Sequence, residues 1–251
     1  MTREERVTLA AYRCVAPVVH EIGGAVCLRF PEASDSPMLN RVVGLGVDAP
    51  ATEDDVDDVL AAMGRDVSFY VAVAPGARPP ELSDWLEERG LERGWGWMAF
   101  RRGVDALERR PTELRLVPVE NGEQAAAFAR VVRIGYGLPD ALEPVIARAP
   151  EMGWACWLAL DGDEPASAAG IFVAEGAGYL GFAATLAEHR GRGAQNALLA
   201  ERIEHAAKLG CDVVLTETGE RRDDLPSSSY RNIVRAGFQE VAVTANWLGR
   251  R

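Results

Sequence analysis

The chain has 251 residues, of which 48% are hydrophobic and 26% charged, and its formal net charge at pH 7 is −11. This composition is typical of a soluble globular protein and excludes collagen-like, coiled-coil and disordered chains. Residues 1–111 carry 13 basic and 19 acidic side chains, and residues 112–251 carry 14 and 19, so neither half has the charge of a nucleic-acid-binding or anionic-membrane-binding body.

Apolar runs and cysteines narrow the class of protein further. No run approaches the ~20 apolar residues of a membrane helix, and the first six residues lack the basic-then-apolar order of a secretory signal. The four cysteines lie far apart, without a CxxC pair. We therefore expect reduced thiols, no metal site, no membrane or nucleic-acid partner, and a cytoplasmic monomer or homodimer.

The first half of the chain alternates between strand and helix patterns. Short apolar runs rich in β-branched residues indicate strands, and apolar residues at helical spacing indicate helices. We expect a helix at 2–21, strands at 25–30 and 40–47, a helix at 52–63, a strand at 68–74, a helix at 81–89 and a strand at 95–100.

The second half has the same alternation with clearer boundaries, which together predict an α/β (α+β) fold with a mixed sheet. Asn121 is a candidate N-cap of one helix, and Gly210 is expected to end a later, longer one. We expect a strand at 113–117, a helix from 121 to the break at 135–139, and a short helix to about 148. Strands follow at 154–160, 166–174 and 179–186, then a helix through 199–207, a strand at 211–216, a helix through 230–235 and a strand at 241–247.

The order of elements indicates a degenerate internal repeat. From the strand at 40–47 onward, the first half repeats the strand–helix–strand–helix–strand order that the second half shows from Tyr179. We predict two tandem domains, 1–111 and 112–251, joined near Arg109-Arg110-Pro111. The first has the acidic turn Thr52-Glu53-Asp54-Asp55 at its helix start, which repels phosphate. We therefore expect the first domain to be non-catalytic and to cap the second or shape its acceptor pocket.

The segment His-Arg-Gly-Arg-Gly-Ala-Gln-Asn at 189–196 has the features of an anion site. Gly191 and Gly193 allow a sharp turn before a helix, so backbone amides converge where the helix dipole favours negative charge. Arg190 and Arg192 add local positive charge. A phosphate or pyrophosphate is the expected ligand, and a glycine turn with two solvated arginines is the alternative.

Two other phosphate motifs fit this segment less well. A P-loop requires Lys followed by Ser or Thr where the chain has Ala194-Gln195. A dinucleotide GxGxxG fingerprint fits Gly191 and Gly193 but meets Asn196 at the third glycine. Glu217, at the end of the following strand, would then be its ribose-binding acid, so this alternative stays open.

Arg190-Gly191-Arg192-Gly193-Ala194-Gln195, after the strand at 182–186, resembles the acyl-CoA loop of the GNAT acetyltransferase superfamily. Residues 229–238 resemble the fourth helix of that family with its closing Gly-Phe, and the resemblance extends over about residues 113–248. It implies a GNAT-like fold, with the first domain as a degenerate GNAT-like repeat. Gln195 stands where the family has Gly or Ala. Ile233 stands where it often has the tyrosine that protonates the leaving thiolate.

The resemblance implies an N-acetyltransferase that moves an acetyl group from acetyl-CoA to a primary amine of a small molecule or peptide. The amine would attack directly within a ternary complex, and a backbone N–H near Leu186 would polarise the thioester carbonyl. The resemblance assigns cofactor binding to Leu186, Arg190, Gly191, Arg192, Gly193, Ala194, Gln195 and Asn196.

Catalytic residues are less clearly marked. Glu217 is the candidate base, Tyr230 a candidate donor to the sulfur, and Ser229 a candidate partner of the thiol; each also fits a structural role. Tyr136 and Tyr179 are expected to border the acceptor. Two alternative functions remain, a non-catalytic acyl-CoA sensor or interaction protein and, less favoured, a dinucleotide-binding oxidoreductase.

Overall fold

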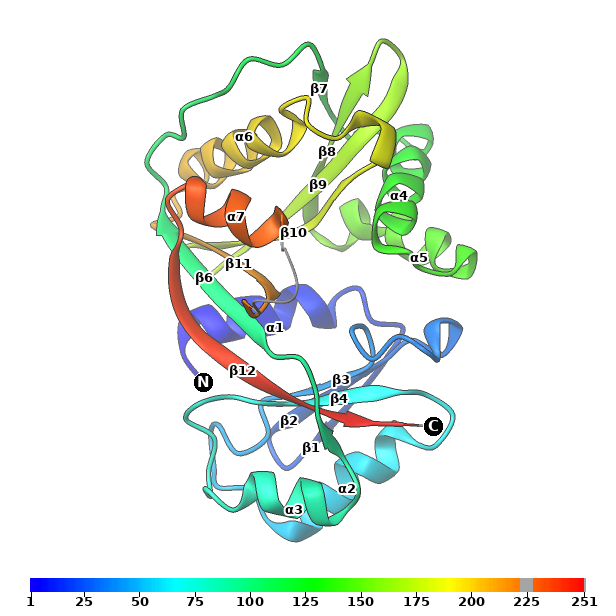
Figure 1. Cartoon of the computed structure of the whole chain (residues 1–251), viewed down its shortest axis with the longest axis vertical. Coiled ribbons are helices and arrows are strands. Elements are labelled where there is room, and N and C mark those ends of the chain that lie inside the picture. Colours follow the sequence, from blue (N-terminus) through cyan, green and yellow to red (C-terminus); the bar gives the residue numbers. More distant parts are fainter. Residues whose placement is uncertain (222–227, 251) are drawn as a thin grey trace. The chain divides into compact units, whose positions relative to one another are not determined.

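Residues 1–221 and 228–250 are described by a computed structural model of the chain, and Figure 1 shows their helices and strands. The chain divides into two units. One holds Met1–Ala99, Glu217–Pro226 and Val241–Arg251, and the other holds Phe100–Thr216 and Ser227–Glu240. This division differs from the expected boundary after residue 111, because segments near the C-terminus pack with N-terminal residues. The two-domain division at residue 111 remains a prediction.

The first unit is a sheet covered by helices. Its strands pair in the order β1–β2–β3–β4–β12, antiparallel except for β3 and β4, which are parallel and connected through α2. Its elements are α1 (Arg3–Arg13), β1 (Val18–Ile22), β2 (Ala25–Arg29), the 3-10 turn Pro31–Ala33, β3 (Arg41–Val43), α2 (Glu53–Met63), β4 (Phe69–Val73), α3 (Leu82–Glu88), β5 (Glu92–Arg93) and most of β12 (Gln239–Gly249).

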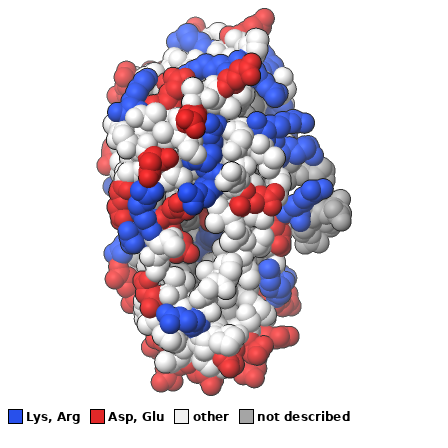
Figure 2. Space-filling model, turned by 90° about the vertical axis from the view of Figure 1, so that its left-hand side faces the viewer, with Lys and Arg blue, Asp and Glu red and all other residues white. Residues whose placement is uncertain are grey.

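Helices α2 and α3 pack on the sheet of the first unit. Val56 and Val59 of α2 and Leu86 of α3 are fully buried against Val71 of β4, so these two helices cover one face of the sheet. Acidic side chains gather over the end that α2 and α3 form (Figure 2). That surface therefore carries part of the excess negative charge of the chain.

The second unit is a longer sheet with helices on both faces. Its strands β7 to β10 form an antiparallel meander, and β10 and β11 are parallel and connected through α6. Helices α4 and α6 lie on opposite faces of β8 and β9 (Figure 1). The elements are the end of β6 (Trp97–Gly103), β7 (Arg115–Pro118), α4 (Gly122–Tyr136), the 3-10 turn Asp140–Leu142, α5 (Glu143–Ala147), the 3-10 turn Ala149–Met152, β8 (Trp154–Asp161), β9 (Glu164–Ala174), β10 (Ala177–Thr185), the 3-10 turn Ala187–His189, α6 (Ala194–Lys208), the first part of β11 (Val213–Gly219) and α7 (Ser228–Arg235).

The two units share one topology, as the order of predicted elements indicates. In each, three strands form an antiparallel meander, and a helix then leads to a fourth strand parallel to the third. Helix α2 of the first unit thus corresponds to α6 of the second. The first unit therefore repeats the second at the level of strand pairing.

Two predicted elements of the first half are wrong in extent. The N-terminal helix ends at Arg13 rather than near residue 21, because 18–22 form a strand that turns back through Gly23 and Gly24. Both glycines have positive φ, as a tight hairpin requires. The strand expected at 40–47 is only Arg41–Val43, since a turn with positive φ at Gly44 and Gly46 follows it. All four cysteines are unpaired, as expected.

Candidate functional site

The predicted anion site forms a turn between β10 and α6. Gly191 and Gly193 have φ of 80° and 84°, the left-handed region that glycine enters without steric cost. Gly193 is the N-cap of α6, which has no side-chain cap and no acidic residue in its first turn. The positive end of the helix dipole is therefore not compensated from within the helix.

Backbone amides of this turn are available to a ligand. Within the described part of the chain, the amides of residues 191–196 donate to no protein acceptor, and the first amide bonded back is that of Ala197, to the Gly193 oxygen at 3.1 Å. The corresponding helix α2 is different, because the Thr52 hydroxyl accepts from the Asp55 amide and the Asp55 carboxylate accepts from the Thr52 amide. Of these two helix starts, the one before α6 combines free amides with a first turn that lacks carboxylates.

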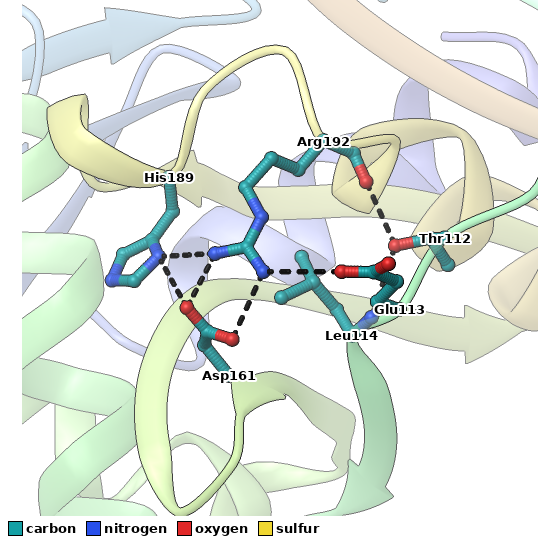
Figure 3. Close-up of polar contacts among 6 residues, drawn as sticks. All are labelled: Thr112, Glu113, Leu114, Asp161, His189 and Arg192. Carbon is teal, nitrogen blue, oxygen red and sulfur yellow. Dashed lines mark hydrogen bonds and ion pairs between the residues drawn. The ribbon is translucent and has the colours of Figure 1, made fainter.

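Arg192 has protein partners of its own (Figure 3). Its guanidinium forms a two-point ion pair with Asp161 at the end of β8, one hydrogen bond being 2.9 Å long, and lies 3.3 Å from His189 Nδ1. The Arg192 hydrogen bond holds the pKa of Asp161 below its ordinary value. The Arg192 carbonyl accepts from the Thr112 hydroxyl at 2.7 Å. Arg192 thus anchors the turn. The guanidinium of exposed Arg190 donates to the Thr185 carbonyl at 3.4 Å, and its amide donates to the Ala187 carbonyl at 3.3 Å.

The other polar side chains of the motif also fasten the turn. Asn196 accepts from the Arg110 amide at 2.7 Å and donates to the Glu108 carbonyl at 3.3 Å. Gln195 donates to the Thr185 hydroxyl at 2.8 Å, which connects the start of α6 to the end of β10. These side chains hold the backbone in place, so the amides carry most of the predicted anion binding.

Strand β10 leaves the ladder of β11 and bulges. The parallel register pairs Ala177–Tyr179 with Val213–Leu215. Further along, the register with β9 shifts between Gly181 and Ala184, and Phe182 has φ of 54°. An extra residue at this point is a β-bulge, which bends a strand and re-aims its amides. No pattern in the sequence predicted this bulge.

Leu186 itself has no free amide, because its N–H donates to the Ala166 carbonyl at 3.0 Å. The expected role of an amide near Leu186 therefore cannot be taken by the Leu186 amide itself, and the nearest irregular stretch of β10 is the bulge.

The candidate catalytic residues have the following surroundings. Glu217 accepts a 2.6 Å hydrogen bond from the Tyr12 hydroxyl within the first unit. The Tyr230 hydroxyl donates to Glu240, and its ring packs edge-on against Phe100. Ser229 is exposed in the first turn of α7. Ile233, on the same helix, is buried.

The two candidate acceptor residues differ in environment. Tyr179 is buried and packs edge-on against Trp154. The Tyr136 side chain is exposed over 40% of its surface, yet its hydroxyl end is buried, which raises the pKa to about 12. The Arg202 charge and a hydrogen bond from the Ala183 backbone amide act in the opposite direction.

Arg202 is a buried cation that sequence analysis missed. It is 1% exposed and donates to the carbonyls of Leu198, Gly170 and Gly181, at 3.0, 3.2 and 3.4 Å. Burial lowers its pKa to about 10. Its position four residues after Leu198 and four before Ala206, on the apolar stripe of α6, was the available signal.

Comparisons with known proteins place this site in a family context. Residues 136–225 match the sequence model of the acetyltransferase (GNAT) family, about a third of the chain. None of the curated protein sequences matches the chain.

The described helices include none that is long and apolar enough to cross a bilayer. The described residues also hold no cluster of three or more potential metal ligands.

Solved structures share the fold at low sequence identity. A GCN5-related N-acetyltransferase from Kribbella flavida is 18% identical with a TM-score of 0.65, covering 99% of this chain and 96% of its own. A tandem GNAT protein of the clavulanic acid biosynthesis pathway is 14% identical with a TM-score of 0.66, covering 97% and 86%. A putative GNAT acetyltransferase from Novosphingobium aromaticivorans is 18% identical with a TM-score of 0.60, covering 99% and 97%. The expected mixed α/β, GNAT-like fold is confirmed, and the structures that share it include a tandem GNAT protein.

Proposed function

We propose that the chain is an N-acetyltransferase that transfers an acetyl group from acetyl-CoA to a primary amine of a small molecule or peptide. The observation that carries the proposal is the turn at 189–193 with the uncapped start of α6. Its free amides at 191–196 would form a cradle for a diphosphate. The side chains of Arg192, Gln195 and Asn196 bind neighbouring protein groups and so hold the turn in place. The GNAT family match over 136–225 supports acyl transfer as the reaction.

The residues present fit acetyl-CoA as co-substrate. The amides of 191–196 would hold the diphosphate, with Arg190 as an exposed additional cation. The edge of β10 beyond Tyr179, where the register with β11 ends, would hold the pantetheine amides through its backbone. This is the same kind of main-chain recognition that β-strand edges give to extended ligands.

Direct transfer needs few protein groups. The attacking amine has to lose a proton, because a lysine-like amine has a pKa near 10.4 in water. Glu217 is the proposed acceptor of that proton, directly or through water, and Tyr12 fixes its carboxylate. A leaving thiolate is a weak base, with a Cys-like pKa near 8.5, so departure requires little acid assistance. The buried Ile233 at the usual tyrosine position is therefore compatible with turnover.

Calorimetry and a thiol-release assay test the proposal together. The wild-type chain is titrated with acetyl-CoA, CoA and NAD, and free thiol is then followed with a panel of primary amines. We expect binding of both CoA species, no binding of NAD, and amine-dependent thiol release. Gly193→Asp is the matched variant, because it adds a side chain and a negative charge within the cradle. Binding of NAD in preference to acetyl-CoA would refute the proposal.

One observation favours a second candidate, a non-catalytic acyl-CoA sensor. The Tyr230 hydroxyl is engaged by Glu240 and Ile233 is buried, so helix α7 presents no free acid at the expected place. Tight acetyl-CoA binding without thiol release, together with a change in proteolytic protection on binding, would favour this candidate.

A further inference from the structure

Residues 108–112, here called the strap, run along the start of α6 without forming a helix or a strand. The Asn196 side chain holds the strap at two points, the Arg110 amide at 2.7 Å and the Glu108 carbonyl at 3.3 Å. The Arg109 guanidinium adds ion pairs to two glutamates of the same helix, each 2.9 Å long. The strap is therefore fastened to α6 before it reaches the glycine turn.

Thr112, at the end of the strap, contacts the glycine turn itself. Its hydroxyl donates to the Arg192 carbonyl at 2.7 Å and accepts from the Leu114 amide at 3.2 Å (Figure 3). Because the Leu114 amide brings its own hydrogen, the hydrogen of the hydroxyl is left for the Arg192 carbonyl. A Cβ on Gly193 would lie 3.2 Å from the Thr112 Cβ, so the strap packs closely against this glycine.

The Arg192 carbonyl and the Gly193 amide belong to one planar peptide group. In a trans peptide the C=O and N–H bonds point in opposite directions. A carbonyl held by Thr112 therefore directs the Gly193 N–H away from the strap. This amide donates to no acceptor among the described residues, so its hydrogen is available to a ligand on the other side of the turn.

Glycine at position 193 does not by itself select this orientation of the peptide plane. Its φ is 84°, but glycine adopts negative φ about as readily, and half a turn of the plane changes mainly this φ and the ψ of Arg192. The ion pair between Arg192 and Asp161 holds the side chain and leaves the peptide plane free to rotate. The contact that selects the orientation is the hydrogen bond from the Thr112 hydroxyl.

We propose that Thr112 is a positioning residue for coenzyme A, whose hydroxyl holds the peptide between Arg192 and Gly193 so that the Gly193 N–H donates to the bound diphosphate. This inference rests on the proposed function, which supplies the diphosphate. A plane turned the other way would present the Arg192 carbonyl oxygen to the phosphate, so attraction would be replaced by repulsion. Thr112 acts through the turn, so it affects the binding of the co-substrate rather than the transfer of the acetyl group.

Thr112→Val and Thr112→Ser form a matched pair of variants. Valine keeps the shape of threonine and loses the hydroxyl, whereas serine keeps the hydroxyl and loses a methyl group. In calorimetry at fixed salt we expect Thr112→Val to weaken acetyl-CoA binding about three- to tenfold, and Thr112→Ser to stay within about twofold of the wild type. With an amine that the wild type acetylates, Thr112→Val should raise KM for acetyl-CoA by a similar factor and change kcat by less than about twofold.

Nuclear magnetic resonance of isotope-labelled glycine amides reads the orientation of the peptide directly. On saturation with acetyl-CoA, we expect the Gly193 amide proton to move downfield in the wild type and in Thr112→Ser, as a new hydrogen bond to phosphate requires. In saturated Thr112→Val the movement should be much smaller. Gly210, beyond the other end of α6, is the internal control and should not move in any of the three proteins.

A Gly193 resonance that stays in place when the wild type is saturated with acetyl-CoA would overturn the inference, even if both variants fail to fold. Wild-type affinity in Thr112→Val, equal losses in Thr112→Val and Thr112→Ser, or a fall in kcat at unchanged KM would overturn it as well. A wild-type chain that binds no acetyl-CoA would refute the proposed function, and this inference with it.

Discussion

Replacing Gly193 by alanine is the sharpest test of the phosphate cradle, because Gly191 provides a control two residues away. Both residues have φ between 80° and 84°, so alanine is strained at either position by about 1–2 kcal/mol. They differ in available space. A Cβ at 193 would lie 3.0 Å from the Pro111 carbonyl oxygen and 3.2 Å from the Thr112 Cβ, whereas a Cβ at 191 meets nothing within 4 Å.

The extra contact at 193 involves backbone, which yields less readily than a side-chain end. Overpacking of this kind costs about 1 kcal/mol or more, which corresponds to roughly fivefold in affinity. Because the turn can relieve this contact only by moving away from its present geometry, we expect Gly193→Ala to weaken acetyl-CoA binding about fivefold more than Gly191→Ala. We also expect it to lower the thermal midpoint by a few degrees more than Gly191→Ala does. Isothermal titration at fixed salt measures both. Equal losses in the two variants, or an unchanged affinity in Gly193→Ala, would refute the reasoning.

Three other predictions follow from the same geometry. Arg192→Ala should weaken acetyl-CoA binding, most at low salt, because it leaves the Asp161 carboxylate without its guanidinium partner beside the turn. Calorimetry should show partial recovery of the affinity in the double variant with Asp161→Asn, and no recovery would contradict this explanation. Thr52→Ala should lower the free energy of unfolding by about 1 kcal/mol through loss of the α2 cap, and a loss of acetyl-CoA affinity would count against a non-binding first unit. Arg192 lowers the pKa of Asp161, so the ionised carboxylate stabilises the fold fully above its unfolded pKa near 3.9. This stabilisation is lost as the pH falls through the lower pKa of the folded state. Urea midpoints should therefore drop more steeply below about pH 4 in the wild type than in Asp161→Asn.

Much of the chain's local structure follows from short-range sequence signals. The Asn121 side chain accepts from the Gln124 amide as an N-cap, and α4 ends at Gly137 in the left-handed conformation. The glycine turn before α6 has the predicted positive φ values, and the acidic start of α2 caps itself. Even the N-terminal hairpin had a local signal in Gly23-Gly24, which the helical pattern before it obscured.

The sequence by itself therefore determined where most strands and helices and the glycine turn before α6 lie, because capping, glycine conformation and apolar periodicity depend on neighbours a few residues apart. Only the tertiary structure decided which partners those elements receive. It pairs Arg192 with Asp161, 31 residues away, and Tyr12 with Glu217, 205 residues away. It also brings the Arg202 guanidinium of α6 to the Gly170 and Gly181 carbonyls of β9 and β10. Strand order and packing, rather than local propensity, determine which distant groups share an interior.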